Sequence, residues 1–219
     1  MSDSDPTALE RFLNGILPEN PIYRQLLGMC PTLAVTGAMK PAVTMAAATA
    51  FVLVSANLIV SLIRGLLKPH LRILVFTLTI ATFVTIADKA LAAYLYQMSK
   101  QLGPYVPLII VNCIIISRCE ICASKQSVGV ALADALGMSL GFALGLASIA
   151  TVREILGSGT WFGLPVLPSG WHGWGIMVLP PGAFLTLGIL LALVEWGTRA
   201  EARTWVWRTV RMLWAWRHS

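Results

Sequence analysis

The chain of 219 residues is 57% hydrophobic and only 12% charged, and its mean hydropathy is +0.75. Soluble domains are about 45–50% apolar and about 25% charged, so this composition excludes a soluble enzyme, a disordered chain and a disulfide scaffold. The net charge of +6 comes from basic residues that flank apolar segments. That pattern indicates contact with anionic lipid and no role in nucleic-acid binding. The sequence therefore predicts an all-α, polytopic membrane protein.

An acidic N-terminal segment, residues 1–20, precedes the apolar part of the chain and lacks the apolar core of a cleavable signal peptide. A transmembrane helix needs about 20 mostly apolar residues. Four segments meet this requirement: 41–63, 73–96, 127–152 and 176–194.

Two further apolar segments are irregular. Residues 21–38 contain Arg24 and a central Pro31, and residues 102–117 are short and contain two prolines and Asn112. Without these two segments the chain would have four spans. We count both and predict six transmembrane helices.

The distribution of basic residues predicts the orientation of the six spans. An even number of spans places both termini on one side, and a cytoplasmic assignment puts twelve Lys and Arg residues inside and four outside. Cytoplasmic loops carry the excess of Lys and Arg, so we expect both termini in the cytoplasm. The basic, Trp- and Arg-rich tail, residues 197–219, would then lie at the lipid headgroups.

The two irregular segments resemble each other and predict an internal repeat. Each carries one cysteine near its centre, Cys30 and Cys113, which are 83 residues apart, and each is followed by two regular spans. Residues 21–98 and 99–196 would thus be two three-span halves of opposite orientation, because three is odd. Such inverted repeats carry broken helices that meet near the bilayer midplane.

The breaks would present two thiols to one another. Gly28 and Pro31 bracket Cys30, and Asn112 precedes Cys113, so both cysteines lie where a regular helix is disrupted. A buried cysteine is often simply a small apolar residue, but paired thiolates suit zinc or an iron–sulfur cluster. Both kinds of site commonly take four ligands, so a second copy or a sister subunit would have to supply the others.

The remaining polar residues of the apolar segments leave alternatives open. Cys119 and Cys122 form a C-x-x-C, which is compatible with a metal site, although local packing is the better interpretation because a fourth nearby ligand is lacking. Asp134 lies either at a solvated helix end or on an ion path. We expect Asp88-Lys89 to be a locally paired end of a span and Arg153-Glu154 to be a boundary pair. The three histidines, His70, His172 and His218, are too scattered for a metal site.

Several stretches of the sequence resemble one family of membrane subunits. They are NP-IYRQLLGMCPTLAVT (20–36), VSLIR (60–64), PLIIVNCIIISRCE (107–120), REILGSGTWFG (153–163) and LPPGAFLTLG (179–188). The family occurs in the Rnf ferredoxin:NAD oxidoreductase complex and in the related sodium-pumping NADH:quinone reductase. CP-TLAVT and LPPGAF look like the E subunit of Rnf rather than the D subunit of the reductase. The resemblance covers residues 20 to 195, so it does not extend to the tail.

The resemblance implies a translocase subunit that transfers electrons and performs no bond chemistry alone. It implies a multi-pass protein of the bacterial inner membrane, a partner A subunit of the same fold, and the further B, C, D and G subunits of Rnf. Cys30 and Cys113 match the family positions that ligate an intramembrane [2Fe–2S] cluster shared with the A subunit. This cluster would relay electrons across the bilayer between ferredoxin and NAD, coupled to ion translocation. Cys119 and Cys122 depart from the family pattern, in which small apolar residues are typical.

Two other classes of protein compete with this interpretation. A secondary transporter would use the same inverted repeats and broken helices, with structural cysteines, but would place charges or hydroxyls at both breaks. A scaffold would merely anchor other subunits. Spectra of the purified complex would distinguish an electron carrier from both.

Overall fold

The computed structural model describes residues 8–16, 18–66, 69–166 and 173–196. It is mainly helical, and four of its helical segments are long and apolar enough to cross a membrane: Met39–Ile63, Arg72–Tyr94, Val106–Ala123 and Val128–Ser158. These four correspond to the predicted spans 41–63, 73–96, 102–117 and 127–152. The predicted tail, 197–219, lies outside the described residues.

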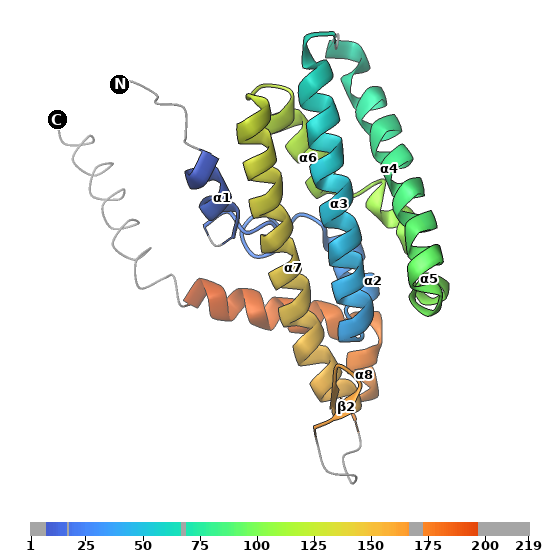
Figure 1. Ribbon diagram of the computed structural model, residues 1–219. Coiled ribbons are helices and arrows are strands. Elements are labelled where there is room, and N and C mark those ends of the chain that lie inside the picture. The colour runs from blue at the N-terminus through green and yellow to red at the C-terminus, as the bar shows by residue number, and fades with distance from the viewer. Residues whose placement is uncertain (1–7, 17, 67–68, 167–172, 197–219) are drawn as a thin grey trace, which may run out of the picture.

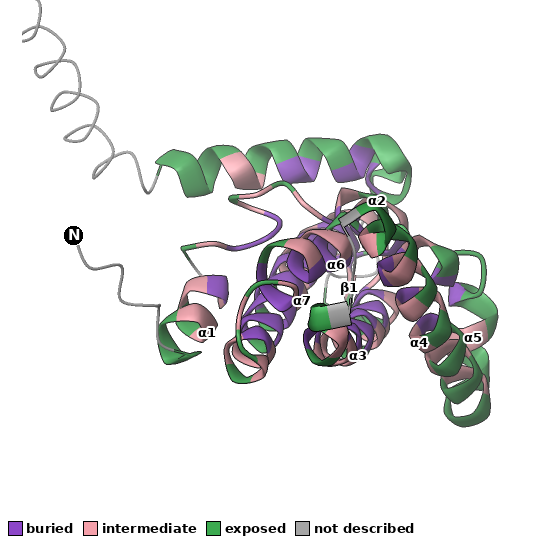
Figure 2. Cartoon of the chain, turned by 90° about the horizontal axis from the view of Figure 1, so that it is seen from above, coloured by how far each residue is buried: buried purple, intermediate pink, exposed green. Residues whose placement is uncertain are grey.

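Three uninterrupted helices form the centre of the molecule. They are α3 (Met39–Ile63), α4 (Arg72–Tyr94) and α7 (Val128–Ser158), and α7 packs most extensively against α3. Figures 1 and 2 show α7, α3 and α4 side by side, with the short α1 (Ala8–Ile16) on the outer side of α7. Large apolar side chains such as Leu53 and Phe142 fill the core between them. In this arrangement α3 and α7 are more deeply buried than α4, which lies at the edge.

The two irregular segments are broken in the structure, as their prolines and glycine predict. In the first, residues 20–28 are not helical and α2 spans only Met29–Val35. In the second, a 3-10 turn at Val106–Ile109 is followed by α6 (Cys113–Arg118) and a π-helical turn at Cys119–Ala123. Between α4 and this segment lies α5 (Tyr96–Leu102). Neither cysteine-bearing segment is a continuous helix.

The last predicted span, 176–194, differs from the expectation. The chain forms a short α8 (Gly175–Val178) and then a separate apolar helix, Pro180–Trp196. Pro180 and Pro181 account for the interruption, because proline ends one helix and is tolerated in the first turn of the next. Pro180–Trp196, orange-red in Figure 1, lies crosswise to α7, and Figure 2 shows it beside the bundle. Six spans in two inverted halves thus remain a prediction.

A β-hairpin follows α7. Strands β1 (Thr160–Trp161) and β2 (Leu164–Pro165) pair antiparallel through a two-residue turn. Both turn residues, Phe162 and Gly163, have positive φ angles of 58° and 83°, as a type I′ turn requires. The hairpin lies at the end of the bundle where α7 ends and α3 begins, shown at the bottom of Figure 1.

The opposite end of the bundle carries some of the basic residues predicted to be cytoplasmic, among them Arg64, Arg72 and Lys125. The Arg64 guanidinium donates to the carbonyl of Gln126, and Arg72 pairs with Glu120 at 3.6 Å. The short connections Arg64–Leu66, Pro69–Leu71 and 124–127 therefore share one end. Lys68 lies outside the described residues. Lys40 and Arg153 lie at the other end of the bundle.

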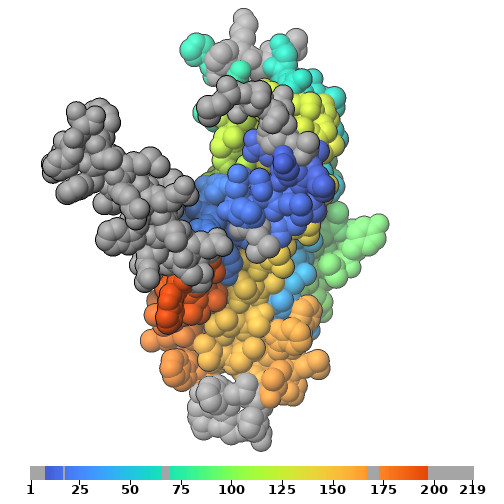
Figure 3. Space-filling model, turned by 90° about the vertical axis from the view of Figure 1, so that its left-hand side faces the viewer, coloured from blue at the N-terminus to red at the C-terminus, as the bar shows by residue number. Residues whose placement is uncertain are grey.

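A row of glycines lets the N-terminal segment pack closely on α7. Gly137, Gly141 and Gly145 recur every four residues on one face of the helix. A Cβ atom on Gly141 would collide with the carbonyl oxygen of Gly15, and one on Gly145 would lie 2.5 Å from the Ile22 side chain. Small residues at this spacing allow such backbone approach between membrane segments. Figure 3 shows the blue N-terminal residues lying over the yellow α7.

Candidate functional site

The two cysteines predicted as ligands lie at the starts of the two short helices. Cys30 is the second residue of α2, and Cys113 is the first residue of α6. Asn112 caps α6, because its side chain accepts from the amide of Ile114 at 3.2 Å. Before α2 the backbone turns through Gly28, whose φ of +74° is in the left-handed region that favours glycine. Each break therefore has a local cause in the residue before the helix.

A hydrogen bond joins the two breaks directly. The amide of Gly28 donates to the sulfur of Cys113 at 2.9 Å. Two residues of chain span at most about 7 Å, so the backbone of Cys30 lies within about 10 Å of that sulfur. A side chain at Gly28 would collide with Ile114 and Phe142, at 2.6 and 2.9 Å from its Cβ. The structure thus packs the break before Cys30 against Cys113, which is 83 residues later in the sequence.

Both candidate thiols are exposed on the isolated chain. Cys113 opens into a pocket of about 620 Å³ that is also lined by Leu27, Arg72, Phe76 and Glu120, which we call the Cys113 pocket. Cys30 opens into a separate pocket of about 390 Å³ that is also lined by Leu33, Tyr105, Arg153, Val178 and Pro180, which we call the Cys30 pocket. Exposed cysteines in apolar membrane segments are accessible to a partner subunit at this surface.

These residues fit half of a [2Fe–2S] site. Such a cluster takes four cysteine thiolates, and within the described residues no three His, Cys, Asp or Glu side chains gather to hold a metal. The Gly28 amide supplies a hydrogen bond to one candidate ligand sulfur, which is a recognised influence on cluster potential. The donor set is therefore compatible with two ligands from this chain and two from another.

Cys119 and Cys122 are placed differently from the candidate ligands. Both are buried, at 0% and 3% exposure, in the π-helical turn that follows α6. They belong to the core that includes Phe76 and Met138. Their burial agrees with the expectation that they are packing residues.

Asp134 has a partner that its own helix did not reveal. Its carboxylate lies 3.4 Å from Arg118, and the side chains are 1% and 5% exposed. Arg118 also donates to Gln25 at 3.0 Å and lies 3.9 Å from Glu19. Arg118 therefore links α6, α7 and the stretch before α2. No sequence motif singled out this network, although a buried acid in a membrane span calls for a nearby cation.

Arg153 and Glu154 do not form the boundary pair that the sequence suggested. Arg153 donates to the carbonyls of Met177, Val178 and Leu179 and, at 2.7 Å, to the hydroxyl of Thr36. Glu154 accepts from the backbone amide of Met39 at 2.6 Å, which satisfies an amide at the start of α3. The two neighbours point to different elements and tie α7 to α8, α2 and α3.

The other polar residues show no common site. Within the part of the chain that the structure describes, the Asp88 side chain has no ion pair or hydrogen bond, so the expected pairing with Lys89 is not formed. His70 is exposed in a 3-10 turn. His172 and His218 lie outside the described residues.

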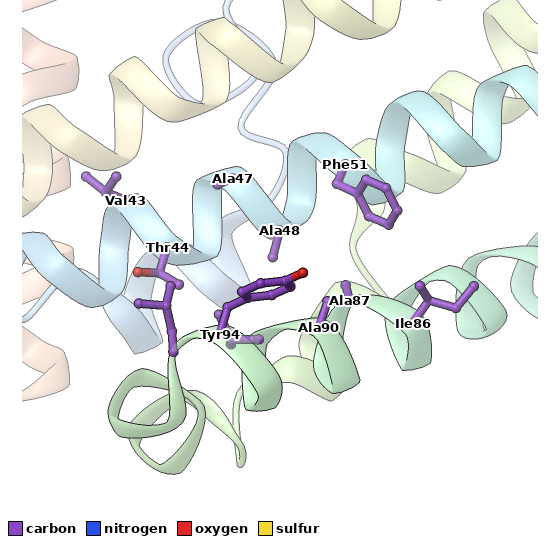
Figure 4. A pocket seen from close by; sticks show the side chains of 11 residues that line it. Val43, Thr44, Ala47, Ala48, Phe51, Ile86, Ala87, Ala90 and Tyr94 are labelled. Atoms are coloured by element: carbon purple, nitrogen blue, oxygen red, sulfur yellow. The ribbon is translucent and has the colours of Figure 1, made fainter.

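A third pocket, of about 480 Å³, lies between α3 and α4 and contains neither cysteine. Figure 4 shows small side chains, among them Ala47, Ala48, Ala87 and Ala90, on the two facing helices, with the Tyr94 ring between them. Both helices are candidate membrane spans. Apart from the Thr44 and Tyr94 hydroxyls the lining is apolar, which suits contact with lipid chains.

Two broken helical segments, which contact each other at Gly28 and Cys113 among candidate membrane spans, define a multi-pass membrane protein with a candidate sulfur site. The family model described as "Rnf-Nqr subunit, membrane protein" matches residues 8–191. The chain belongs to this Rnf-Nqr family of membrane subunits.

Named relatives fall into both branches of the family. The chain is 42% identical over 191 residues to the E subunit of the Na⁺-translocating ferredoxin:NAD⁺ oxidoreductase complex of Acetobacterium woodii, covering 87% of this chain and 97% of the relative. It is 40% identical to the E subunit of the proton-translocating ferredoxin:NAD⁺ oxidoreductase complex of Clostridium ljungdahlii, covering 84% and 86%. It is 43% identical to the D subunit of the Na⁺-translocating NADH-quinone reductase of Aeromonas salmonicida, covering 86% and 90%. The family resemblance inferred from the sequence is confirmed.

Proposed function

We propose that this chain is the E subunit of an ion-translocating ferredoxin:NAD oxidoreductase of the Rnf type, located in the bacterial inner membrane. In this role it holds an intramembrane [2Fe–2S] cluster through Cys30 and Cys113, together with two cysteines of a homologous A subunit. The observation that carries the proposal is the hydrogen bond from the Gly28 amide to the Cys113 sulfur, which brings the two cysteine-bearing breaks together. The B, C, D and G subunits complete the proposed complex.

The local chemistry supports two ligands from this chain. Free thiolates are costly to bury in an apolar environment, so thiolates at this depth need the positive charge of a metal. When bound, a [2Fe–2S] cluster accepts and donates a single electron. Gly28 contributes an amide hydrogen to the Cys113 sulfur, and Asn112 fixes the first turn of α6, so both contacts hold Cys113 in position.

The exposure of both thiols supports an interface position. A site with only two ligands from one chain is complete only after a second chain has joined. The cluster would then link the two subunits, and its assembly would depend on both. Relatives named as ion-translocating complexes support coupling of this electron transfer to ion movement at the level of the whole complex.

The proposal is tested on the purified complex with Cys30→Ala and Cys113→Ala. Each variant should lose the EPR signal of the intramembrane cluster and ferredoxin-dependent NAD reduction. The matched control is Cys119→Ala with Cys122→Ala, which changes two buried cysteines in the segment that carries Cys113. This control should keep its iron and its EPR signal.

The alternative function is a transporter-like ion-path subunit whose cysteines are structural. A Cys30→Ala complex that kept both iron and electron transfer would favour that alternative and refute the cluster assignment. Loss of iron in the Cys119/Cys122 control would instead show that the ligands are assigned to the wrong cysteines.

A further inference from the structure

Arg153 is a buried cation with no counterion among the residues that the structure describes. Its exposure is 2%, and all four of its hydrogen-bond partners are neutral oxygens, the Thr36 hydroxyl and three backbone carbonyls. Within the described residues no carboxylate lies within 4 Å of its guanidinium. Burying a charge is costly unless an opposite charge is nearby, so this position calls for an anionic group.

The Cys30 pocket is where such a group would lie. Arg153 and Cys30 both line this pocket of about 390 Å³. Arg153 also holds Thr36, the C-cap of α2, at 2.7 Å, and Cys30 is six residues earlier along this helix. Six helical residues rise by about 9 Å, so the guanidinium lies within electrostatic range of the thiol in surroundings that screen charges weakly.

The other cysteine lacks an equivalent free charge. The Cys113 pocket also contains an arginine, Arg72, but Glu120 lines the same pocket and lies 3.6 Å from it. The positive charge at the Cys113 pocket is therefore offset by a carboxylate, whereas the charge at the Cys30 pocket is not.

We propose that Arg153 is a positioning residue that offsets the negative charge of the cluster held by Cys30 and thereby raises the reduction potential of that cluster. This inference rests on the proposed function. A cluster bound by thiolates is anionic and becomes more negative when it gains an electron, so a nearby cation stabilises the reduced form more than the oxidised form. The hydrogen bonds of Arg153 to α8 and Thr36 hold the charge in place.

The experiment is a redox titration of the purified complex followed by low-temperature EPR, together with iron analysis. Arg153→Gln should give a cluster with a more negative midpoint potential. Arg153→Lys keeps the positive charge but not the several N–H donors of the guanidinium, and its midpoint potential should stay close to that of the unmodified complex. The control is Lys40→Gln, which removes an exposed cation at the same end of the bundle and should leave the midpoint unchanged.

Each outcome decides the inference. An unchanged midpoint in Arg153→Gln overturns it, as does an equal shift in Arg153→Gln and Arg153→Lys, or loss of iron from both. Loss of iron from Arg153→Gln alone, with a normal cluster in Arg153→Lys, supports a requirement for the charge. The proposed function itself is refuted if the unmodified complex lacks the EPR signal or if a Cys30→Ala complex keeps it. An unchanged midpoint potential in Arg153→Gln refutes only the role of Arg153.

Discussion

Replacing Arg118 with methionine should destabilise the protein more than any loss of a surface charge. The Arg118–Asp134 pair is almost fully buried, with side chains 5% and 1% exposed, so water cannot replace the lost partner of Asp134. Removing one member of a buried pair costs about 3–5 kcal/mol, because the other charge is left uncompensated. For a chain of this size each kcal/mol corresponds to about 2–4 °C, so the unfolding midpoint should fall on the order of 10 °C.

The double-mutant cycle gives this prediction its specificity. Asp134→Leu alone should cost less than Arg118→Met, because Arg118 keeps Gln25 at 3.0 Å and the half-exposed Glu19 at 3.9 Å. In the double variant no uncompensated charge remains at Asp134, so most of the lost stability should return. The assay uses the purified complex with a fluorescent protein fused to this subunit. After heating, gel filtration measures how much of the fluorescent complex is left, and this gives the thermal midpoint.

One result would refute this reasoning. If the double variant is as unstable as Arg118→Met, the cost comes from the lost contacts of Arg118 with Gln25 and Glu19, and the buried charge of Asp134 is not its cause.

Two further predictions concern packing and topology. Gly141→Leu should lower the free energy of unfolding by about 1–3 kcal/mol through overpacking, because its Cβ would collide with the Gly15 carbonyl oxygen. The control, Gly129→Leu, should be nearly neutral in the same thermal assay, because no atom lies within 4 Å of the added Cβ. Equal effects of the two substitutions would contradict the close packing of α1 on α7. Tags at residues 1 and 219 should both be protected from a membrane-impermeant label in intact cells, as the excess of basic residues inside predicts, and labelling of either tag would overturn the orientation.

The regular spans could be predicted from sequence because hydropathy and length are local properties. The predicted segments 41–63, 73–96 and 127–152 differ from α3, α4 and α7 by at most six residues at any end. The breaks near Cys30 and Cys113 were also foreseen, since glycine, proline and asparagine disrupt helices through their own backbone chemistry. The crosswise course of Pro180–Trp196 was not, because an apolar sequence does not fix the direction in which a helix packs.

The candidate site was predictable in its residues but not in its contacts. Cys30 and Cys113 stood out by their central position in two similar segments. The close approach of Ile114 and Phe142 to Gly28 could not be predicted, because these residues are far away in sequence. In the same way, the partner of Asp134 lies outside its own helix, and the neutral hydrogen-bond partners of Arg153 come from α2 and α8. Tertiary contacts of this kind leave no periodic signal in the chain.

The glycine row on α7 has a consequence for the order of events during synthesis. The segment from Gly15 to Ile22 packs against Gly141 and Gly145, which leave the ribosome more than a hundred residues later. The N-terminal part of the chain must therefore wait without its final neighbours, although nascent chains otherwise mature from the N-terminus onward. The stretch that leads to Cys30 acquires its surroundings only when α7 has been inserted, so the proposed cluster would be loaded only after translation has passed the fifth predicted span.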